Sequence, residues 1–349
     1  MKRRAAQMEL FTPEPLAARA SEVELAPRLP RSTRDPGPVP APDPELVALA
    51  ARQPGHVRLG TSSWTFPGWR GLVYRRRYAS ERIFTQRSLE EYASFPLFRT
   101  VGIDRSFWAP IPEHELASYA AQLPEGFRCV MKVWEELTTV SYPSHPRYGA
   151  RAGQKNPHFL DAGVFRELVA DPVARAFARH LGAFVLEIPP PPKLPHRPDF
   201  ERALARFLEE VPREAPSGEV FHYAVELRDK RLFTRRHVEL LRAHRASHVW
   251  NHWSRMPSIG AQRELAGDAL DRVAVARLML PHGASYAEQK AAFAPFDRLV
   301  TPDPEMREDV LRLARDAGER GTELYVIVNN KVEGSSPWTV RALAERLAG

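Results

Sequence analysis

Charged side chains interrupt several apolar stretches of this 349-residue chain. Glu226 and Arg228 are two positions apart in one such stretch, so they share a face if the stretch is a β-strand. Lys132 and Arg277 each lie in a similar apolar run. A carboxylate beside cations that hold an anion is the arrangement needed for acid–base catalysis on an anionic substrate. We therefore predict Glu226 and Lys132 as catalytic residues of a hydrolase or lyase.

The remaining candidate residues would bind the substrate. They lie at or just beyond the ends of the predicted strands, and two of them are tryptophans that would stack on a ring. The predicted substrate-binding residues are Trp64, Asp104, Trp108, Glu187, Arg228, Asn251, Arg277, Asn329 and Asn330. Because several of them are cationic, the expected ligand is a small anion such as a sugar phosphate or a nucleotide.

Other interpretations of these residues stay open. Glu226 and Arg228 can instead join Lys132 or Arg277 in a buried ion pair that only satisfies the core. Glu187 and Glu226 would also suit a glycosidase pair, and Lys132 a Schiff base. The 12 histidines form neither an H-x-H nor an H-E-x-x-H motif, so no metal site is predicted, and the sequence identifies no cofactor.

Eight short apolar stretches alternate with helical patterns from residue 56 onward. Nearly continuous apolar strands are typical of a parallel sheet buried on both faces, and eight of them with helical crossovers predict a (β/α)8 TIM-like barrel, an α/β fold. In such a barrel the segments after the strands form the ligand-binding face. An open doubly wound sheet is disfavoured, because residues 60–64 lack the G-x-G-x-x-G spacing. The predicted strands are 57–61, 98–103, 127–133, 183–188, 223–228, 247–251, 273–279 and 323–329.

Helical patterns and one long insertion fill the connections. The crossover between the sixth and seventh strands has a poorly marked helix. An insertion over 135–161, with three prolines and two glycines, is the kind of loop that is functional or disordered. All seven tryptophans fall at or beyond strand ends and none on a helix face, which predicts an aromatic-walled pocket or a hydrophobic lid. The predicted helices are 80–95, 113–123, 164–180, 200–210, 234–244, 306–320 and 337–347.

The first 54 residues differ in composition from the rest. Seven prolines lie between positions 27 and 44, among few aromatic or β-branched residues. Such a segment buries too little apolar surface to offset its chain entropy. We predict a disordered proline-rich leader over 1–54, in which a short helix near 44–52 stays open, followed by the barrel domain over 55–349.

The net charge and the single cysteine limit which partners and which cellular compartment are expected. The net charge of +7 reflects either a solvated basic surface or attraction to polyanions. A nucleic-acid-binding or phosphodiester-cleaving protein is therefore the second hypothesis, and a non-catalytic ligand-binding barrel is the third. The single cysteine, Cys129, excludes an internal disulfide, and no apolar run approaches the ~20 residues that cross a bilayer. We expect a cytoplasmic protein without a membrane partner; the sequence does not indicate the oligomeric state.

Several segments, taken in order from residue 57 to the C-terminus, resemble the YecE-like family. This group, domain of unknown function 72, has a TIM-barrel fold and no assigned reaction. Residues 225–228 match its V-E-F-R motif, and Arg277 aligns with its strand-seven arginine. Similar segments are 60–64 with Trp69-Arg70-Gly71 and Tyr74, then 98–108, 127–132, 185–190, and Asn329-Asn330 with Gly334. The resemblance implies the barrel fold.

Three positions depart from the family pattern. The family's strand-two glutamate is Gly102 here, its glutamine before Pro-Pro is Glu187, and its aspartate after strand six is Asn251. If the family acts through that glutamate, this chain has an altered site or is inactive.

Overall fold

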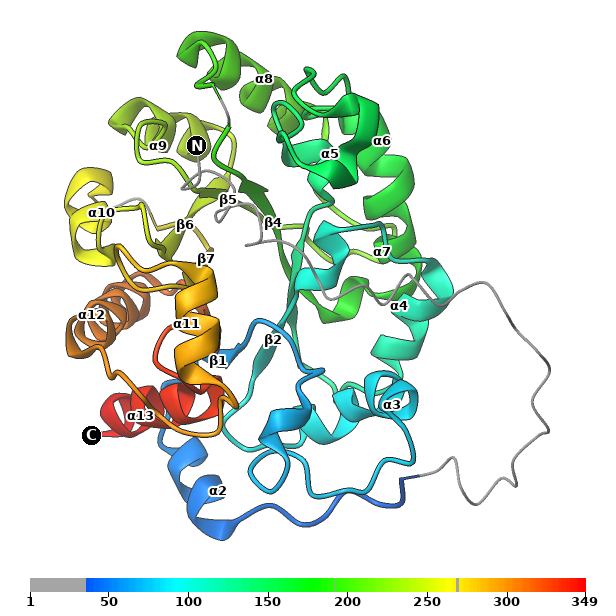
Figure 1. Ribbon diagram of the computed structural model, residues 1–349, viewed down its shortest axis with the longest axis vertical. Helices are drawn as coiled ribbons and strands as arrows, with labels where there is room; N and C mark the ends of the chain where they lie inside the picture. Colours follow the sequence, from blue (N-terminus) through cyan, green and yellow to red (C-terminus); the bar gives the residue numbers. More distant parts are fainter. Residues whose placement is uncertain (1–35, 192, 268–269) are drawn as a thin grey trace.

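The computed structural model describes residues 36–191, 193–267 and 270–349, and its eight parallel strands close into one barrel (Figure 1). Neighbours in the chain are neighbours in the sheet, and β8 pairs with β1 to complete the ring. The predicted (β/α)8 fold is therefore confirmed. The strands are β1 Val57–Thr61, β2 Thr100–Ile103, β3 Cys129–Lys132, β4 Leu181–Ile188, β5 Tyr223–Leu227, β6 Ala246–His252, β7 Val273–Leu278 and β8 Glu323–Val328.

Helices follow every strand and cover the outside of the barrel (Figure 1). Many begin where a polar side chain caps the free backbone amides; the Ser80 hydroxyl accepts from the Ile83 amide, for example. The helices are α2 Pro44–Ala51, α3 Glu81–Ala93, α4 Glu113–Ala120, α5 Glu135–Thr138, α6 Ala162–Phe165, α7 Asp171–Ala176, α8 Arg197–Glu210, α9 Arg235–Ala243, α10 Ile259–Ala266, α11 Tyr286–Phe293, α12 Pro304–Arg320 and α13 Ser336–Ala348. In the part of the chain that the structure describes, none of them is long and apolar enough to cross a membrane.

The inside of the barrel is packed with alternate residues of the strands. Their side chains form an inner cluster that is separate from the larger core between strands and helices. Because strand side chains alternate between the two faces, each inward row predicts which later residue reaches the C-terminal mouth. The inner cluster consists of Val130, Ala183, Val185, Ala224, Val249, Val273, Val275, Tyr325 and Ile327. Two positions further along, four of these rows continue with Lys132, Glu187, Glu226 and Arg277.

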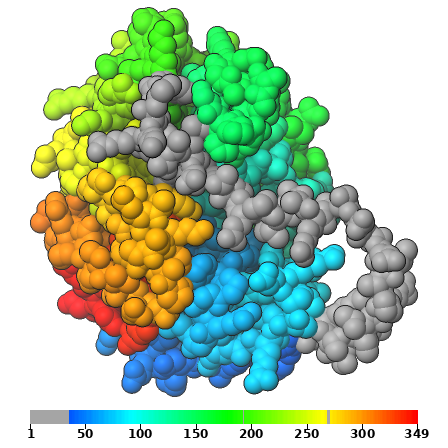
Figure 2. All heavy atoms as spheres, viewed as in Figure 1, coloured from blue at the N-terminus to red at the C-terminus, as the bar shows by residue number. Residues whose placement is uncertain are grey.

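Part of the proline-rich segment packs on the barrel. Leu46 and Leu49 of α2 are buried, and Arg99 donates to the Ala50 carbonyl at 2.7 Å. Helix α2 lies beside α13, so the first and last helices of the described chain are neighbours at one side of the barrel (Figure 2). The short helix that the sequence left open near 44–52 is therefore present as α2, where two leucines bury apolar surface. Residues 1–35 lie outside the described residues.

Three sequence predictions about the connections are corrected. Helix α11 was not predicted, although Ser285 caps its first turn. The single helix expected over 164–180 is divided into α6, a π-helical turn over Arg166–Ala170, α7 and a final 3₁₀ turn. Trp338 lies in the first turn of α13, where its indole N–H donates to the Asp297 carbonyl at 2.8 Å, and Trp69 ends a 3₁₀ turn over Pro67–Trp69, so two tryptophans do sit on helical segments.

Candidate functional site

Side chains from different strands converge at the C-terminal end of the barrel interior. Glu187 at the end of β4 is their centre. Its Oε2 atom lies 3.0 Å from Lys132 Nζ and 2.9 Å from both Arg228 Nη2 and Arg277 Nη1. Lys132 ends β3 and Arg277 belongs to β7, so these contacts join three strands and the residue after a fourth, β5. The predicted convergence of charged residues is therefore present.

Two further carboxylates complete the cluster. Glu226 Oε1 lies 2.6 Å from Arg228 Nη2, and Glu226 Oε2 contacts Arg277 Nη1. Arg277 Nη2 donates to both carboxylate oxygens of Asp104, at 2.8 and 2.7 Å. Three cations thus face three carboxylates, and we call these six residues the ion cluster. These contacts match the alternative interpretation of the sequence, in which the charged residues form buried ion pairs with one another.

The ion cluster is almost closed to solvent. The side chains of Glu187, Glu226, Arg228 and Arg277 are at most 1% exposed, and that of Lys132 is 7% exposed. Asp104 is the most accessible member, at 27%. Burying charges is costly unless each is paired, which the matched numbers of cations and anions achieve here.

The cluster changes the proton affinities of its members. Burial acts to raise the pKa of Glu187, but Arg228, Lys132 and Arg277 outweigh it and hold that pKa well below its usual range. Burial likewise acts to lower the pKa of Arg277, whereas Asp104, Glu226 and Glu187 raise it. These shifts favour the charged forms, so Glu187 is a carboxylate and Arg277 a cation at neutral pH.

Two cations of the ion cluster also make cation–π contacts with aromatic rings that do not belong to the cluster. Lys132 Nζ lies 3.8 Å from the centroid of the Phe107 ring, and the Arg228 guanidinium carbon lies 3.8 Å from that of Trp253. Such cation–π contacts are strengthened where water is excluded. Neither ring was among the predicted site residues.

The two predicted tryptophans contact other parts of the protein. Trp64 is buried against Tyr119, with ring centroids 5.0 Å apart. Trp108 packs on Arg147 of the 135–161 insertion, whose guanidinium carbon lies 4.3 Å from the ring centroid and which also pairs with Glu135. The expected wall of indoles around a ligand is therefore not what these two residues form; they anchor the α3–α4 side of the mouth and the insertion.

The three predicted asparagines also have local partners. Asn251 is buried and donates to the Leu227 carbonyl at 2.7 Å, which ties β6 to β5. Asn329 donates to the Ser62 hydroxyl at 2.9 Å. Asn330 accepts from the backbone amide of Ser336 at 2.8 Å and so positions the start of α13.

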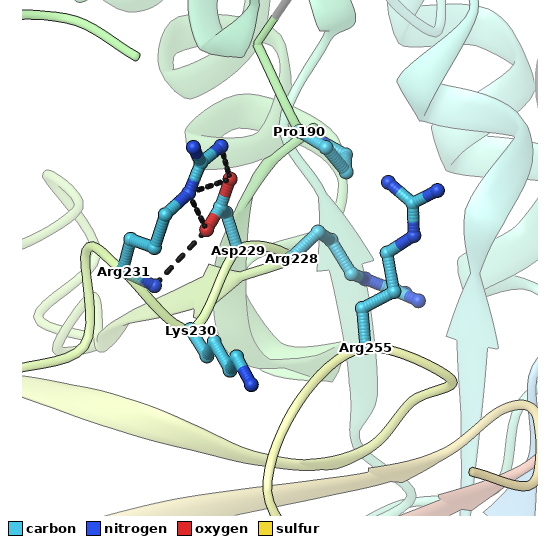
Figure 3. A pocket seen from close by; sticks show the side chains of 6 residues that line it. All are labelled: Pro190, Arg228, Asp229, Lys230, Arg231 and Arg255. Atoms are coloured by element: carbon cyan, nitrogen blue, oxygen red, sulfur yellow. Dashed lines mark hydrogen bonds and ion pairs between the residues drawn. The ribbon is translucent and has the colours of Figure 1, made fainter. Parts of the chain in front are cut away.

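A cavity of about 310 Å³ opens beside the ion cluster, at the C-terminal ends of β5 and β6. Its lining consists of Pro190, Arg228, Asp229, Lys230, Arg231 and Arg255. Four cations and one carboxylate leave an excess of three positive charges. The single carboxylate is already engaged, because Asp229 accepts from Arg231 Nε at 2.9 Å (Figure 3). This bond, ahead of other effects, lowers the pKa of Asp229. Among the residues that the structure describes, no tryptophan lines this cavity.

Arg228 connects the cavity with the ion cluster. Its Nη2 atom contacts Glu187 and Glu226, and its side chain is 1% exposed. Its Nε and Nη1 atoms have no hydrogen-bond acceptor within the described ranges, although they are buried. Leaving such donors unmet costs free energy, and these two nitrogen atoms belong to a residue that lines the cationic cavity.

Four charged lining residues were missed by the sequence analysis. Asp229, Lys230 and Arg231 follow Arg228 directly, and a run of charges immediately after a barrel strand is a signal that could have found them. Arg255 lies three residues beyond β6 and carries no such signal.

Lys331 at the mouth was missed as well. It follows β8, and its ammonium lies 4.4 Å from the centroid of the Tyr286 ring. Burial and the nearby Lys290 lower its pKa to about 8, while Asp104 acts in the opposite direction. For metal ions, the described part of the chain contains no group of three or more histidine, cysteine, aspartate or glutamate residues that could hold one.

Comparisons with known proteins agree with the barrel. The family described as "Protein of unknown function DUF72" matches residues 58–349. A DUF72 family protein of known structure from Enterococcus faecalis V583 is 15% identical, with a TM-score of 0.53 over 83% of this chain and 95% of that one. Another, from Thermotoga maritima MSB8, is 17% identical, with a TM-score of 0.55 over 84% and 99%. No curated protein matches the chain. Identities this low support the fold alone.

Proposed function

The chain belongs to the DUF72 family, as its resemblance to the YecE-like family implied, and on that premise we propose that it is a hydrolase or lyase acting on a small anionic molecule at the C-terminal mouth of the barrel. One observation carries the proposal: Arg228 is buried, two of its nitrogen atoms lack an acceptor among the described residues, and it lines a cavity with three further cations.

In this proposal the cavity holds the anion. Lys230 and Arg255 supply charge, and Arg228 supplies hydrogen-bond donors in a fixed plane. Water is largely excluded around Arg228, which strengthens each charge-assisted hydrogen bond there. Arg231 contributes less, because its guanidinium is shared with Asp229.

Glu226 is the proposed acid or base. It is fully buried, and both of its oxygens lie beside arginine nitrogens, so it must lose an arginine contact before it exchanges a proton with a substrate. A ligand anion competes with Glu226 for the Arg228 guanidinium. Its binding therefore releases Glu226 from one of its arginine contacts. The carboxylate then becomes active only when the cavity is occupied.

The non-catalytic ligand-binding barrel is the second candidate, and the closure of the ion cluster favours it. Three cations and three carboxylates that satisfy one another do not need a substrate to be stable. In that case the cavity binds an anion while the cluster is only its rigid floor. A nucleic-acid partner has less support, because the described residues that line the cavity include no aromatic ring on which a base could stack.

Calorimetry with inorganic phosphate and a panel of sugar phosphates tests the proposal. We expect Arg255→Gln to weaken binding of the best ligand by about tenfold, the value of one charge-assisted hydrogen bond. Arg341→Gln on α13 is the matched control, since it removes an exposed arginine that contacts Glu345 and Trp338 far from the lining residues. Equal effects of the two variants would show that the cavity is not the anion site.

Activity then separates the two candidates. For an enzyme, Glu226→Gln should retain binding and lose turnover of the ligand that wild type converts. Binding without any conversion by the wild type would instead establish a ligand-binding barrel. A steep loss of oligonucleotide affinity with salt, at affinities above those for sugar phosphates, would favour the nucleic-acid hypothesis.

A further inference from the structure

Lys331 lies at the C-terminal mouth of the barrel, on the turn that follows β8, and its ammonium makes no ion pair with any described residue. Its contact there is with the ring of Tyr286 on α11, whose centroid lies 4.4 Å from Nζ. The residue is half-buried, and Nζ is not among the buried atoms without a partner, so it touches solvent. A molecule that enters the mouth can therefore reach this nitrogen.

The turn that carries Lys331 is fixed by its neighbours. Asn329 Oδ1 accepts from the Lys331 backbone amide at 3.1 Å, and Asn329 Nδ2 donates to the Ser62 hydroxyl at 2.9 Å. The next residue, Val332, is fully buried. The start of the lysine side chain is thus held in place before any ligand binds, which reduces the conformational entropy that binding costs.

The surroundings of Lys331 disfavour its charged form. Burial has the largest effect, and Lys290 on α11 adds to it, while Asp104 acts in the opposite direction; together they lower the pKa of Lys331 to about 8. Asp104 is itself engaged, because Arg277 Nη2 donates to both of its oxygens. Desolvation and a second cation are the means by which proteins make a lysine nucleophilic. About a tenth of Lys331 is then neutral at pH 7, against less than about 0.1% of an ordinary lysine.

Lys132, for which the sequence left a Schiff base open, is less suited to that chemistry. Its ammonium lies 3.0 Å from Glu187 and 3.8 Å from the centroid of the Phe107 ring, and its side chain is only 7% exposed. An amine in such an ion pair must leave its carboxylate before it attacks a carbonyl group. Lys331 has no such partner among the described residues.

We propose that Lys331 is a nucleophilic amine that forms an imine with the carbonyl group of a small aldehyde or ketone at the mouth. The neutral nitrogen attacks the carbonyl carbon, and a C–N bond forms as the C=O π bond opens. The oxygen then leaves as water, with one proton from the amine and one from solvent, and the product is a protonated imine that water can hydrolyse again. The cationic cavity takes no part in this step, so the inference goes beyond the proposed function and does not depend on it.

Competitive acetylation measures the reactivity of the amine. The protein is treated with a trace of acetic anhydride at pH 7, unfolded and labelled to completion with the deuterated reagent, so that mass spectrometry gives the relative rate for each lysine. We expect Lys331 to react about tenfold or more faster than the exposed Lys155, because far more of it is neutral. Lys290→Gln should raise the pKa of Lys331 and slow its acetylation at pH 7 by about twofold, with little change at pH 10.

Reductive trapping tests the carbonyl step itself. Cyanoborohydride reduces a protonated imine to a stable secondary amine, so glycolaldehyde should leave a hydroxyethyl group on the reacting lysine. At pH 7 we expect this group on Lys331 at about ten times the level on Lys155 or more, in line with its larger neutral fraction. Lys331→Arg keeps the positive charge beside Tyr286; it should lose this modification and unfold near the wild-type temperature.

Two results would overturn the proposal. Acetylation of Lys331 no faster than that of Lys155 would show an ordinary surface amine. Fast acetylation without preferential trapping of glycolaldehyde would show an activated amine at which carbonyl compounds do not react. Anion binding at the cavity is measured separately with Arg255→Gln, so its failure would leave the outcome at Lys331 unchanged.

Discussion

Replacing Glu187 with glutamine tests whether the ion cluster is balanced as described. Glutamine keeps the shape of the side chain but removes the charge that faces Lys132, Arg228 and Arg277, all within 3.0 Å of one oxygen. At an effective dielectric constant near 20, each attraction amounts to about 5 kcal/mol before desolvation is subtracted. Desolvation of the carboxylate, several kcal/mol, is recovered in the variant, but the three cations stay buried with one anion too few.

The net loss should therefore resemble that of other broken buried pairs, about 3–5 kcal/mol. For a chain of this length each kcal/mol corresponds to roughly 2 °C, so the unfolding midpoint should fall by about 6–10 °C. Thermal unfolding followed by circular dichroism at pH 7.5 measures the shift. Because the cluster is buried, the difference from wild type should persist in 0.5 M salt.

Glu308 provides a matched control. It also faces three arginines, with contacts of 3.3 Å to Arg312, 3.5 Å to Arg315 and 2.7 Å to Arg346, but it lies on the surface of α12. Exposed ion pairs contribute little to stability, so Glu308→Gln should unfold close to the wild-type midpoint and more closely still in high salt. If Glu187→Gln shifted the midpoint no more than Glu308→Gln does, the buried charge balance would be refuted.

Three further predictions concern the interior. Burial lowers the pKa of His237 to about 3 and that of His248 to about 4, so both are neutral in the folded protein, while in the unfolded chain they take up protons near pH 6.5. The free energy of unfolding should therefore fall as the pH drops below 6.5, by up to about 1.4 kcal/mol per pH unit for each histidine. In urea unfolding between pH 7.5 and 5.5, His237→Phe should reduce the dependence of this free energy on pH. An unchanged pH dependence would contradict this explanation. In thermal unfolding, Gly60→Ala should destabilise the barrel far more than Gly102→Ala. A Cβ at Gly60 would lie 1.9 Å from the Thr100 carbonyl oxygen, whereas a Cβ at Gly102 would have Ser62 Cα as its closest neighbour, at 3.1 Å. Similar unfolding midpoints for the two variants would contradict the β1–β2 packing. Adding Gly102→Glu to Glu187→Gln should recover part of the lost midpoint, and a further decrease would show that the second carboxylate does not reach the cluster.

Strand positions and the inward rows were predictable from sequence because they follow from a two-residue period. Val130 and Lys132, or Val275 and Arg277, must share a face in any strand, and a parallel barrel brings the C-terminal ends of all its strands together. Glu187 has no charged partner within its own strand. Its meeting with charged residues of other strands was predictable from the barrel topology alone.

The location of the cavity was not predictable in the same way. It depends on which charges the cluster already neutralises, and pairing across strands cannot be derived from spacing along one strand. Arg255 reaches the cavity because the loop after β6 folds towards β5, and the tryptophans were misjudged because an indole near a strand end can equally pack on a neighbouring ring, as Trp64 does on Tyr119. Loop conformation decides both, and it leaves no periodic signal.

Two of the departures from the family pattern, Gly102 and Glu187, lie on the inward face of the barrel. The resemblance implies a glutamate at the position of Gly102 and a glutamine at that of Glu187. Gly102 faces inward, since a Cβ there would lie 3.2 Å from the Ile327 side chain in the inner cluster. One carboxylate is thus absent from β2 and another is present on β4, while the aspartate that the resemblance implies after β6 is Asn251 here, so these three positions carry one negative charge fewer than the family pattern. Glu187 contacts all three cations through a single oxygen. Glu187 thus pairs with the cations of the cluster from β4, and the cavity beside Arg228 keeps an excess of positive charge.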